Sequence, residues 1–102
     1  MIRGRRRPPL SYDGDTHGSV GRTANLSATL KDSSGDPLAA QPLIFDFRGE
    51  VMEAITDESG RAVAQVRLKG PPGTYLIQVT FPGSDTYNGS TTEAIIVISE
   101  GP

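Results

Sequence analysis

Apolar and polar residues alternate with a period of two along most of the chain. Between Ala24 and Leu30 every second residue is apolar and the residues between are Asn, Ser and Thr, and the run around Phe45 and Phe47 follows the same rule. One face of each run is therefore apolar and the other polar, which is the pattern of a half-buried β-strand. The alternation predicts seven strands, over residues 10–12, 24–30, 43–47, 51–56, 62–68, 75–81 and 94–98.

Residues that form turns separate these runs. The chain has 12 Gly and 8 Pro, which fall between the apolar runs rather than inside them. The segments 32–37 and 57–60 combine Asp and Ser, whose side chains bond the local backbone, with a Gly that is free to adopt a positive φ. No run has helical periodicity. We therefore predict an all-β fold, a seven-stranded antiparallel immunoglobulin-like Greek-key β-sandwich.

The length of 102 residues is that of one domain. We expect this domain to cover residues 10–99, with a flexible basic segment over 1–9 before it and a short tail over 100–102. No apolar stretch reaches the roughly 18 residues that a membrane span needs, so no span is expected. The basic start leads into Pro8 and Pro9 rather than an apolar run, so no export signal is recognised.

Charge is distributed unevenly between the start of the chain and the rest. Arg3, Arg5, Arg6 and Arg7 contribute four positive charges, which leaves −6 for the rest of a chain whose net charge is −2. A basic arm on an acidic body can bind nucleic acid or an anionic surface. Because no aromatic residues interleave with these arginines, we interpret the arm as a lead-in and expect no nucleic-acid partner.

A series of short motifs resembles a known family. It runs from Tyr12-Asp13-Gly14-Asp15 through the turns at 56–62 and 72–75 to the segment 81–87. In order and spacing, over about residues 10–98, these motifs resemble bacterial immunoglobulin-like domain repeats. The resemblance implies a non-catalytic module, one of several in tandem on an extracellular or cell-surface protein. Its partners would be the neighbouring domains of that protein or another protein.

A second family shares one of these motifs. The segment 68–75 is similar to the turn before strand F in fibronectin type III domains, which usually carry a core Trp that this chain lacks. We therefore keep that family as the alternative. In either family Tyr75 would form a tyrosine corner, with its hydroxyl bonded to nearby backbone.

The sequence offers little material for catalysis. It contains one His, His17, in a loop-like stretch, and no Cys. A nucleophile with its base, or a zinc site, needs more such groups. We expect a protein that is not an enzyme and that has no cofactor.

Calcium is the one metal for which candidates exist. In the predicted topology the loops that carry Asp32, Asp36, Asp57 and Asp85, together with Glu58, share one end of the sandwich, and calcium takes oxygen ligands from flexible loops. Asp at these positions is equally explained by turn geometry, which we favour.

Two surfaces are candidates for contact with a partner. Tyr87 and Asn88 lie in a loop where a large ring with a polar tip suits sugar or protein binding, although Tyr87 closing the end of the core is the favoured interpretation. The apolar run Ile95–Ile98 would invite pairing if its edge is exposed, so we expect a monomer or weak edge-strand self-association. The predicted function is a structural or adhesive module, and the alternative is a calcium-dependent or glycan- or protein-binding module.

Overall fold

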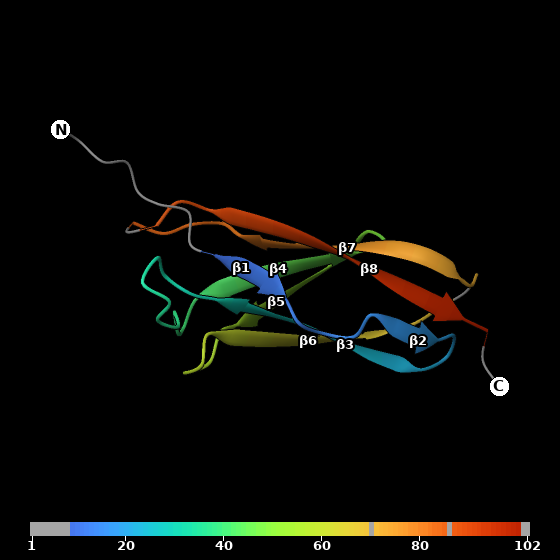
Figure 1. Ribbon diagram of the computed structural model, residues 1–102. Coiled ribbons are helices and arrows are strands. Elements are labelled where there is room, and N and C mark those ends of the chain that lie inside the picture. Colours follow the sequence, from blue (N-terminus) through green and yellow to red (C-terminus); the bar gives the residue numbers. More distant parts are fainter. Residues whose placement is uncertain (1–8, 70, 86, 101–102) are drawn as a thin grey trace.

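The computed structural model describes residues 9–69, 71–85 and 87–100, which form two packed β-sheets (Figure 1). The smaller sheet has the strand order β1-β3-β6 and the larger one β2-β8-β7-β4-β5. The strands are β1 (Leu10–Tyr12), β2 (His17–Ser19), β3 (Thr23–Leu30), β4 (Pro42–Phe47), β5 (Glu50–Ile55), β6 (Arg61–Arg67), β7 (Gly73–Phe81) and β8 (Ser90–Ser99). None of the described segments forms a helix long and apolar enough to cross a membrane.

The core lies between the sheets and follows the predicted alternation. Leu26 of β3 is paired with Ala64 of β6, and Phe45 of β4 with Val79 of β7, and all four side chains are buried. The apolar side chains of both inner faces form one cluster, from Ala24 to Ile98 along the chain. The β-sandwich and its inward-facing residues are therefore as the sequence predicts.

The strand count differs from the prediction: the structure has eight strands, not seven. The opening segment forms two strands, one in each sheet. β1 pairs antiparallel with β3, and β2 pairs parallel with β8, so the sandwich is also not wholly antiparallel. His17, predicted to lie in a loop, begins β2. The sequence His17-Gly18-Ser19 has no apolar alternation, and it joins the sheet through backbone bonds that periodicity does not detect.

The change of sheet takes place between residues 13 and 16. The N–H groups of Asp13 and Asp15 still donate to carbonyls of β3, at N···O distances of 3.0 and 2.9 Å, whereas the carbonyl of Thr16 accepts from Val97 of β8 at 2.9 Å. Gly14 makes the crossing possible. A Cβ there would lie 2.5 Å from the backbone nitrogen of Ser27, so a larger residue would push the segment away from β3.

The apolar run at the end of the chain is partly covered. β8 pairs with β7 at residues 90–98 and with β2 at residues 97–99. Ile96 and Ile98 are buried, whereas Ile95 and Val97 face solvent, with exposed fractions of 56% and 38%. β2 therefore covers the edge of β8 at its last three residues, and self-association stays a prediction.

The loops divide between two ends of the sandwich (Figure 1). Loops 31–41, 56–60 and 82–89 form what we call the N-terminal pole, because Lys31 N–H donates to the carbonyl of Pro9 there. Loops 20–22, 48–49 and 68–72 form the C-terminal pole, where Val20 N–H donates to the carbonyl of Ser99. The predicted basic segment lies, apart from Pro9, outside the described residues.

Candidate functional site

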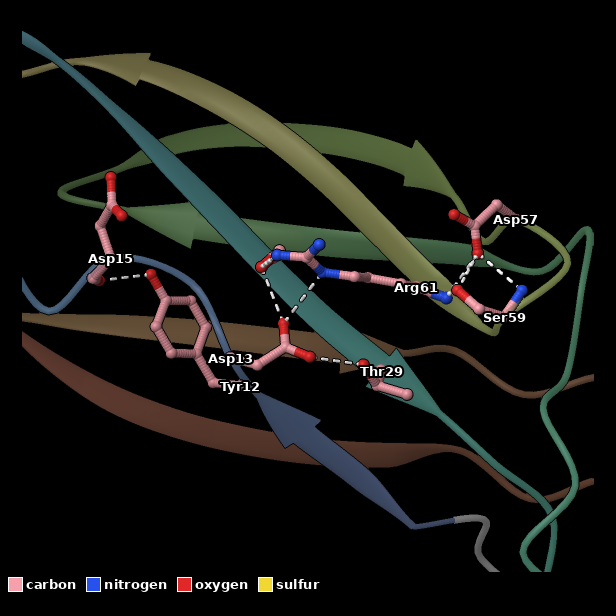
Figure 2. Close-up of polar contacts among 8 residues, drawn as sticks. Tyr12, Asp13, Asp15, Thr29, Asp57, Ser59 and Arg61 are labelled. Carbon is pink, nitrogen blue, oxygen red and sulfur yellow. Dashed lines mark hydrogen bonds and ion pairs between the residues drawn. The ribbon is translucent and has the colours of Figure 1, made fainter.

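The acidic loops do share one pole, as predicted, but the carboxylates of Asp32 and Asp57 bond their own turns. Asp57 Oδ1 accepts from the N–H and the hydroxyl of Ser59, at 2.8 and 2.7 Å, and from the N–H of Arg61 at 3.1 Å (Figure 2). These bonds, that of the Ser59 hydroxyl first, lower the pKa of Asp57 below its usual value. The carboxylate closes the turn before β6.

The second acidic loop is closed in the same way. Asp32 Oδ1 accepts from the N–H groups of Ser34 and Asp36, both at 2.9 Å. Asp36 and Asp85 are exposed. Within residues 9–69, 71–85 and 87–100, no three His, Asp or Glu side chains come together as a metal site would require. Turn geometry accounts for Asp32 and Asp57, and calcium binding remains a hypothesis.

The loop with Tyr87 and Asn88 forms a shallow hollow at the same pole. It is lined by Pro82, Gly83, Ser84, Tyr87, Asn88 and Gly89. Tyr87 N–H donates to the Ser84 hydroxyl at 3.2 Å, and Ser84 N–H donates to the carbonyl of Tyr87 at 2.9 Å. The Tyr87 side chain is half-buried against the core. The structure thus brings both predicted contact residues to one hollow, while much of Tyr87 serves the core.

A polar cluster on the outer face of the smaller sheet was missed by the sequence analysis (Figure 2). We call it the Asp13 cluster. Asp13 accepts from the hydroxyls of Ser27 and Thr29 at 2.7 and 2.5 Å. Arg61 Nε lies 3.5 Å from Asp13 Oδ1, and Arg61 Nη2 donates to the Ser27 hydroxyl at 3.0 Å. The cluster joins β1, β3 and β6 across their outer face.

The pKa values of Asp13 and of the neighbouring Tyr12 follow from their surroundings. Burial acts to raise the pKa of Asp13, but the hydrogen bonds from Thr29 and Ser27 together with Arg61 outweigh it, so the pKa falls below the usual value. Burial, followed by the charges of Asp15 and Asp13, raises the pKa of Tyr12 to about 12. The neutral Tyr12 hydroxyl donates to the carbonyl of Asp15 at 2.7 Å.

The Asp13 cluster is suited to holding strands together rather than to chemistry. Ser27, its potential nucleophile, is fully buried and bonded to Asp13 and Arg61. His17, the chain's one imidazole, is exposed and lies 3.1 Å from the hydroxyl of Thr16. A base and an accessible nucleophile therefore do not meet here. The sequence indicated the cluster only through the polar face of β3, which the alternation predicted to face solvent.

The predicted tyrosine corner lies at the C-terminal pole. The hydroxyl of Tyr75 donates to the carbonyl of Pro71. Its ring meets Phe47 edge to face, with centroids 6.1 Å apart and planes at 73°. The guanidinium of Arg48 lies 4.5 Å above the ring of Tyr75 and donates to the carbonyl of Lys69 at 2.9 Å. These contacts fix Arg48 beside a second hollow, which the sequence did not predict.

The second hollow is mostly lined by charged side chains. Its residues are Phe47, Arg48, Glu50, Arg67 and Lys69. Three cations and one carboxylate therefore surround it. Such a surface favours an anionic group over a neutral or cationic one.

Sequence comparison finds relatives that this chain matches over only part of their length. No family model matches the chain. It is 33% identical over 79 residues to a holo-(acyl-carrier-protein) synthase of Mycobacterium tuberculosis, and 34% identical over 77 residues to that of Mycobacterium bovis. These stretches cover 78% and 76% of this chain, and 59% and 58% of the relatives. The chain thus spans a little over half the length of the curated relatives that it matches.

Comparison of structures shows the fold. A PKD domain of an M14-like peptidase from a Thermoplasmatales archaeon superposes with a TM-score of 0.64 at 17% identity, over 93% of this chain and 95% of that one. An endo-β-1,4-mannanase from Thermotoga petrophila gives 0.63 at 15%, over 99% of this chain and 21% of that one. A CARDB domain from Pyrococcus furiosus, in complex with di-metal ions, gives 0.51 at 14%, over 92% and 96%. PKD and CARDB domains are Ig-like β-sandwiches, so this chain has that kind of fold.

Proposed function

We propose that this chain is a non-catalytic module of the bacterial immunoglobulin-like kind, which spaces or presents the neighbouring domains of an extracellular or cell-surface protein. The observation that carries the proposal is that the first strand begins and the last strand ends at opposite poles of the sandwich. β1 begins at the N-terminal pole and β8 ends at the C-terminal pole (Figure 1). A domain connected at its two poles separates its neighbours by its own length, and the strands between the poles make that length fixed.

Further support comes from the chemistry of the surface and from the neighbours. The buried Ser27 and the exposed His17 do not form a catalytic pair, and the loop carboxylates Asp32 and Asp57 bond their own turns. The mannanase neighbour matches over 21% of its length, so there this fold is one part of a larger enzyme chain. The partial similarity to the synthases supports no activity for this chain, which spans 59% of the first of them.

A ligand-binding module is the second candidate, and the hollow beside Tyr87 and Asn88 is the observation that favours it. A binder is stabilised in proportion to the logarithm of ligand concentration over its dissociation constant, whereas a spacer is indifferent to sugars and metal ions. A melting experiment therefore separates the two candidates.

Spacing itself is tested by placing the chain between a donor and an acceptor fluorescent protein. The matched control is a Gly/Ser linker of the same length, which behaves as a random coil with an end-to-end distance of roughly 55 Å and a broad distribution. We expect single-molecule energy transfer through the chain to give one narrow distribution, unchanged by EDTA, that broadens in urea. A distribution as broad as that of the linker would contradict a spacing role.

A further inference from the structure

Charged loop residues of opposite sign gather at opposite poles. In the described part of the chain, the loops of the N-terminal pole carry five carboxylates and one lysine: Asp32, Asp36, Asp57, Glu58, Asp85 and Lys31. At the C-terminal pole the loops carry Arg22, Arg48 and Lys69, and the residues next to them on β5 and β6 and after β8 add Glu50, Arg67 and Glu100, whereas the corresponding charged residue at the N-terminal pole is Arg61, the first of β6. The described sandwich is therefore acidic at one end and basic at the other.

The basic pole also contains a hollow, and the side chain of Arg48 beside it is held in place. Arg48 is held by the ring of Tyr75 and by the carbonyl of Lys69, so it loses little side-chain freedom when it meets a partner. Arg67 and Lys69 border the same hollow and are exposed. The cations of this pole repel one another, and an anionic partner would relieve that repulsion.

We infer that the basic C-terminal pole docks onto the acidic N-terminal pole of a second copy of this chain, head to tail. The inference rests on the proposed spacing function and names the partner of that module. Because the two surfaces lie at opposite ends, the contact is heterologous and extends into a row of copies instead of closing into a dimer. The carboxylates of Asp36 and Glu58 are both exposed at the acidic pole and can enter the contact.

The size of the contact limits its strength. The two shorter dimensions of the chain are 24 and 19 Å, so one end offers roughly half of the ~800 Å² that each partner of a standard interface buries. Free copies should therefore associate weakly and in a salt-dependent manner. Copies held on one chain would dock far more completely, because tethering raises their effective concentration to about the millimolar range.

The arginines at the start of the sequence are the competing partner for the acidic pole. Arg5, Arg6 and Arg7 precede Pro9, whose carbonyl bonds Lys31 at that pole. Attraction between the acidic loops and these arginines of another copy would also depend on salt. A variant with Arg5→Gln, Arg6→Gln and Arg7→Gln separates this partner from the basic pole.

The test measures backbone amide shifts of the ¹⁵N-labelled chain on dilution from about 1 mM to about 0.05 mM, in about 20 mM and about 500 mM NaCl, where screening lengths are roughly 20 and 4 Å. One variant reverses the basic pole, with Arg67→Glu and Lys69→Glu. A second removes the negative excess of the acidic pole, with Asp36→Lys and Glu58→Lys. The control, Glu53→Lys with Glu93→Lys, changes the net charge by the same amount as the second variant. Its substitutions lie on strands β5 and β8 of the larger sheet.

We expect concentration-dependent shifts at both poles in low salt that disappear in high salt. Each pole variant alone should lose them, and an equimolar mixture of the two should regain them, because the basic pole of one variant can still dock on the acidic pole of the other. The control, whose poles are unmodified, should keep them. Absence of pole shifts in the unmodified chain, or failure of the mixture to regain them, would overturn the inference. So would their loss in the Arg→Gln variant. A chain that keeps its narrow energy-transfer distribution without pole shifts would refute the docking alone, not the spacing function.

Discussion

Two glycines with similar positive φ angles have different surroundings. Gly35 and Gly60 have φ values of +89° and +81°, in the turns that Asp32 and Asp57 close. A Cβ at Gly35 would meet nothing within 4 Å, whereas at Gly60 it would lie 2.4 Å from the carbonyl oxygen of Leu30. Gly35 is needed for its conformation alone, and Gly60 for its conformation and for close packing.

This difference predicts unequal costs for the same substitution. Gly35→Ala should lower the free energy of unfolding by about 1 kcal/mol, the cost of a left-handed conformation for a residue with a Cβ. Gly60→Ala should cost clearly more, because the turn must also move away from Leu30. Urea unfolding of both variants measures the two costs, and equal values would contradict the close approach at Gly60.

The charge of Asp13 links the segment after β1 to β3 and β6. Its carboxylate accepts two hydroxyl donors and faces Arg61, and its pKa is lowered. A lowered pKa in the folded state means that the stabilisation is fully present above the unfolded value of about 3.9 and is lost as the pH falls through the folded value.

Asp13→Asn should therefore destabilise the chain by about 1 kcal/mol at neutral pH, roughly the net contribution of one hydrogen bond. The difference from the unmodified chain should shrink below about pH 4, because the Asp13 carboxyl then becomes protonated first in the unfolded state and, at lower pH, in the folded state. Urea unfolding across this pH range tests it. Thr29→Val, which removes one donor and keeps the carboxylate, should give a smaller loss. A pH dependence that Asp13→Asn leaves wholly intact would contradict the assignment.

At the scale of the strands, the alternation of apolar and polar residues predicted the buried face wherever a strand packs on the core. β4 and β6 bury every second residue, as the sequence predicts. β2 escaped prediction because it is three residues long and is held by backbone bonds to β8. The Asp13 cluster escaped because it depends on which strands are neighbours, and alternation alone cannot bring Asp13 beside Thr29 and Arg61.

The alternation predicts a sharp contrast between adjacent strands of one sheet. Phe45 is fully buried, so Phe45→Ala should cost about 3–5 kcal/mol through lost burial and a cavity. Val51 on the neighbouring strand β5 has 65% of its surface exposed, and Val51→Ala should change stability by less than about 0.5 kcal/mol. Thermal unfolding measures both, and comparable losses would mean that the strands face the other way.

At the scale of the whole molecule, the sequence predicted which loops share a pole but not how their charged groups are used. The gathering of loops 31–41, 56–60 and 82–89 follows from strand order. The bonding of Asp32 and Asp57 to their own turns depends on local backbone geometry. The basic hollow at the other pole depends on the loops that carry Arg48 and Lys69 approaching each other, which no motif indicated.

The proposed spacing function requires no bound ligand or metal ion. Thermal melts of the chain in EDTA and in millimolar calcium are the test, because a ligand that binds only the folded state raises the melting temperature. We expect two melting temperatures that agree within about 1 °C, since the loop carboxylates of Asp32 and Asp57 bond their own turns. A rise of several degrees in calcium would contradict this expectation and would make the acidic pole a metal site.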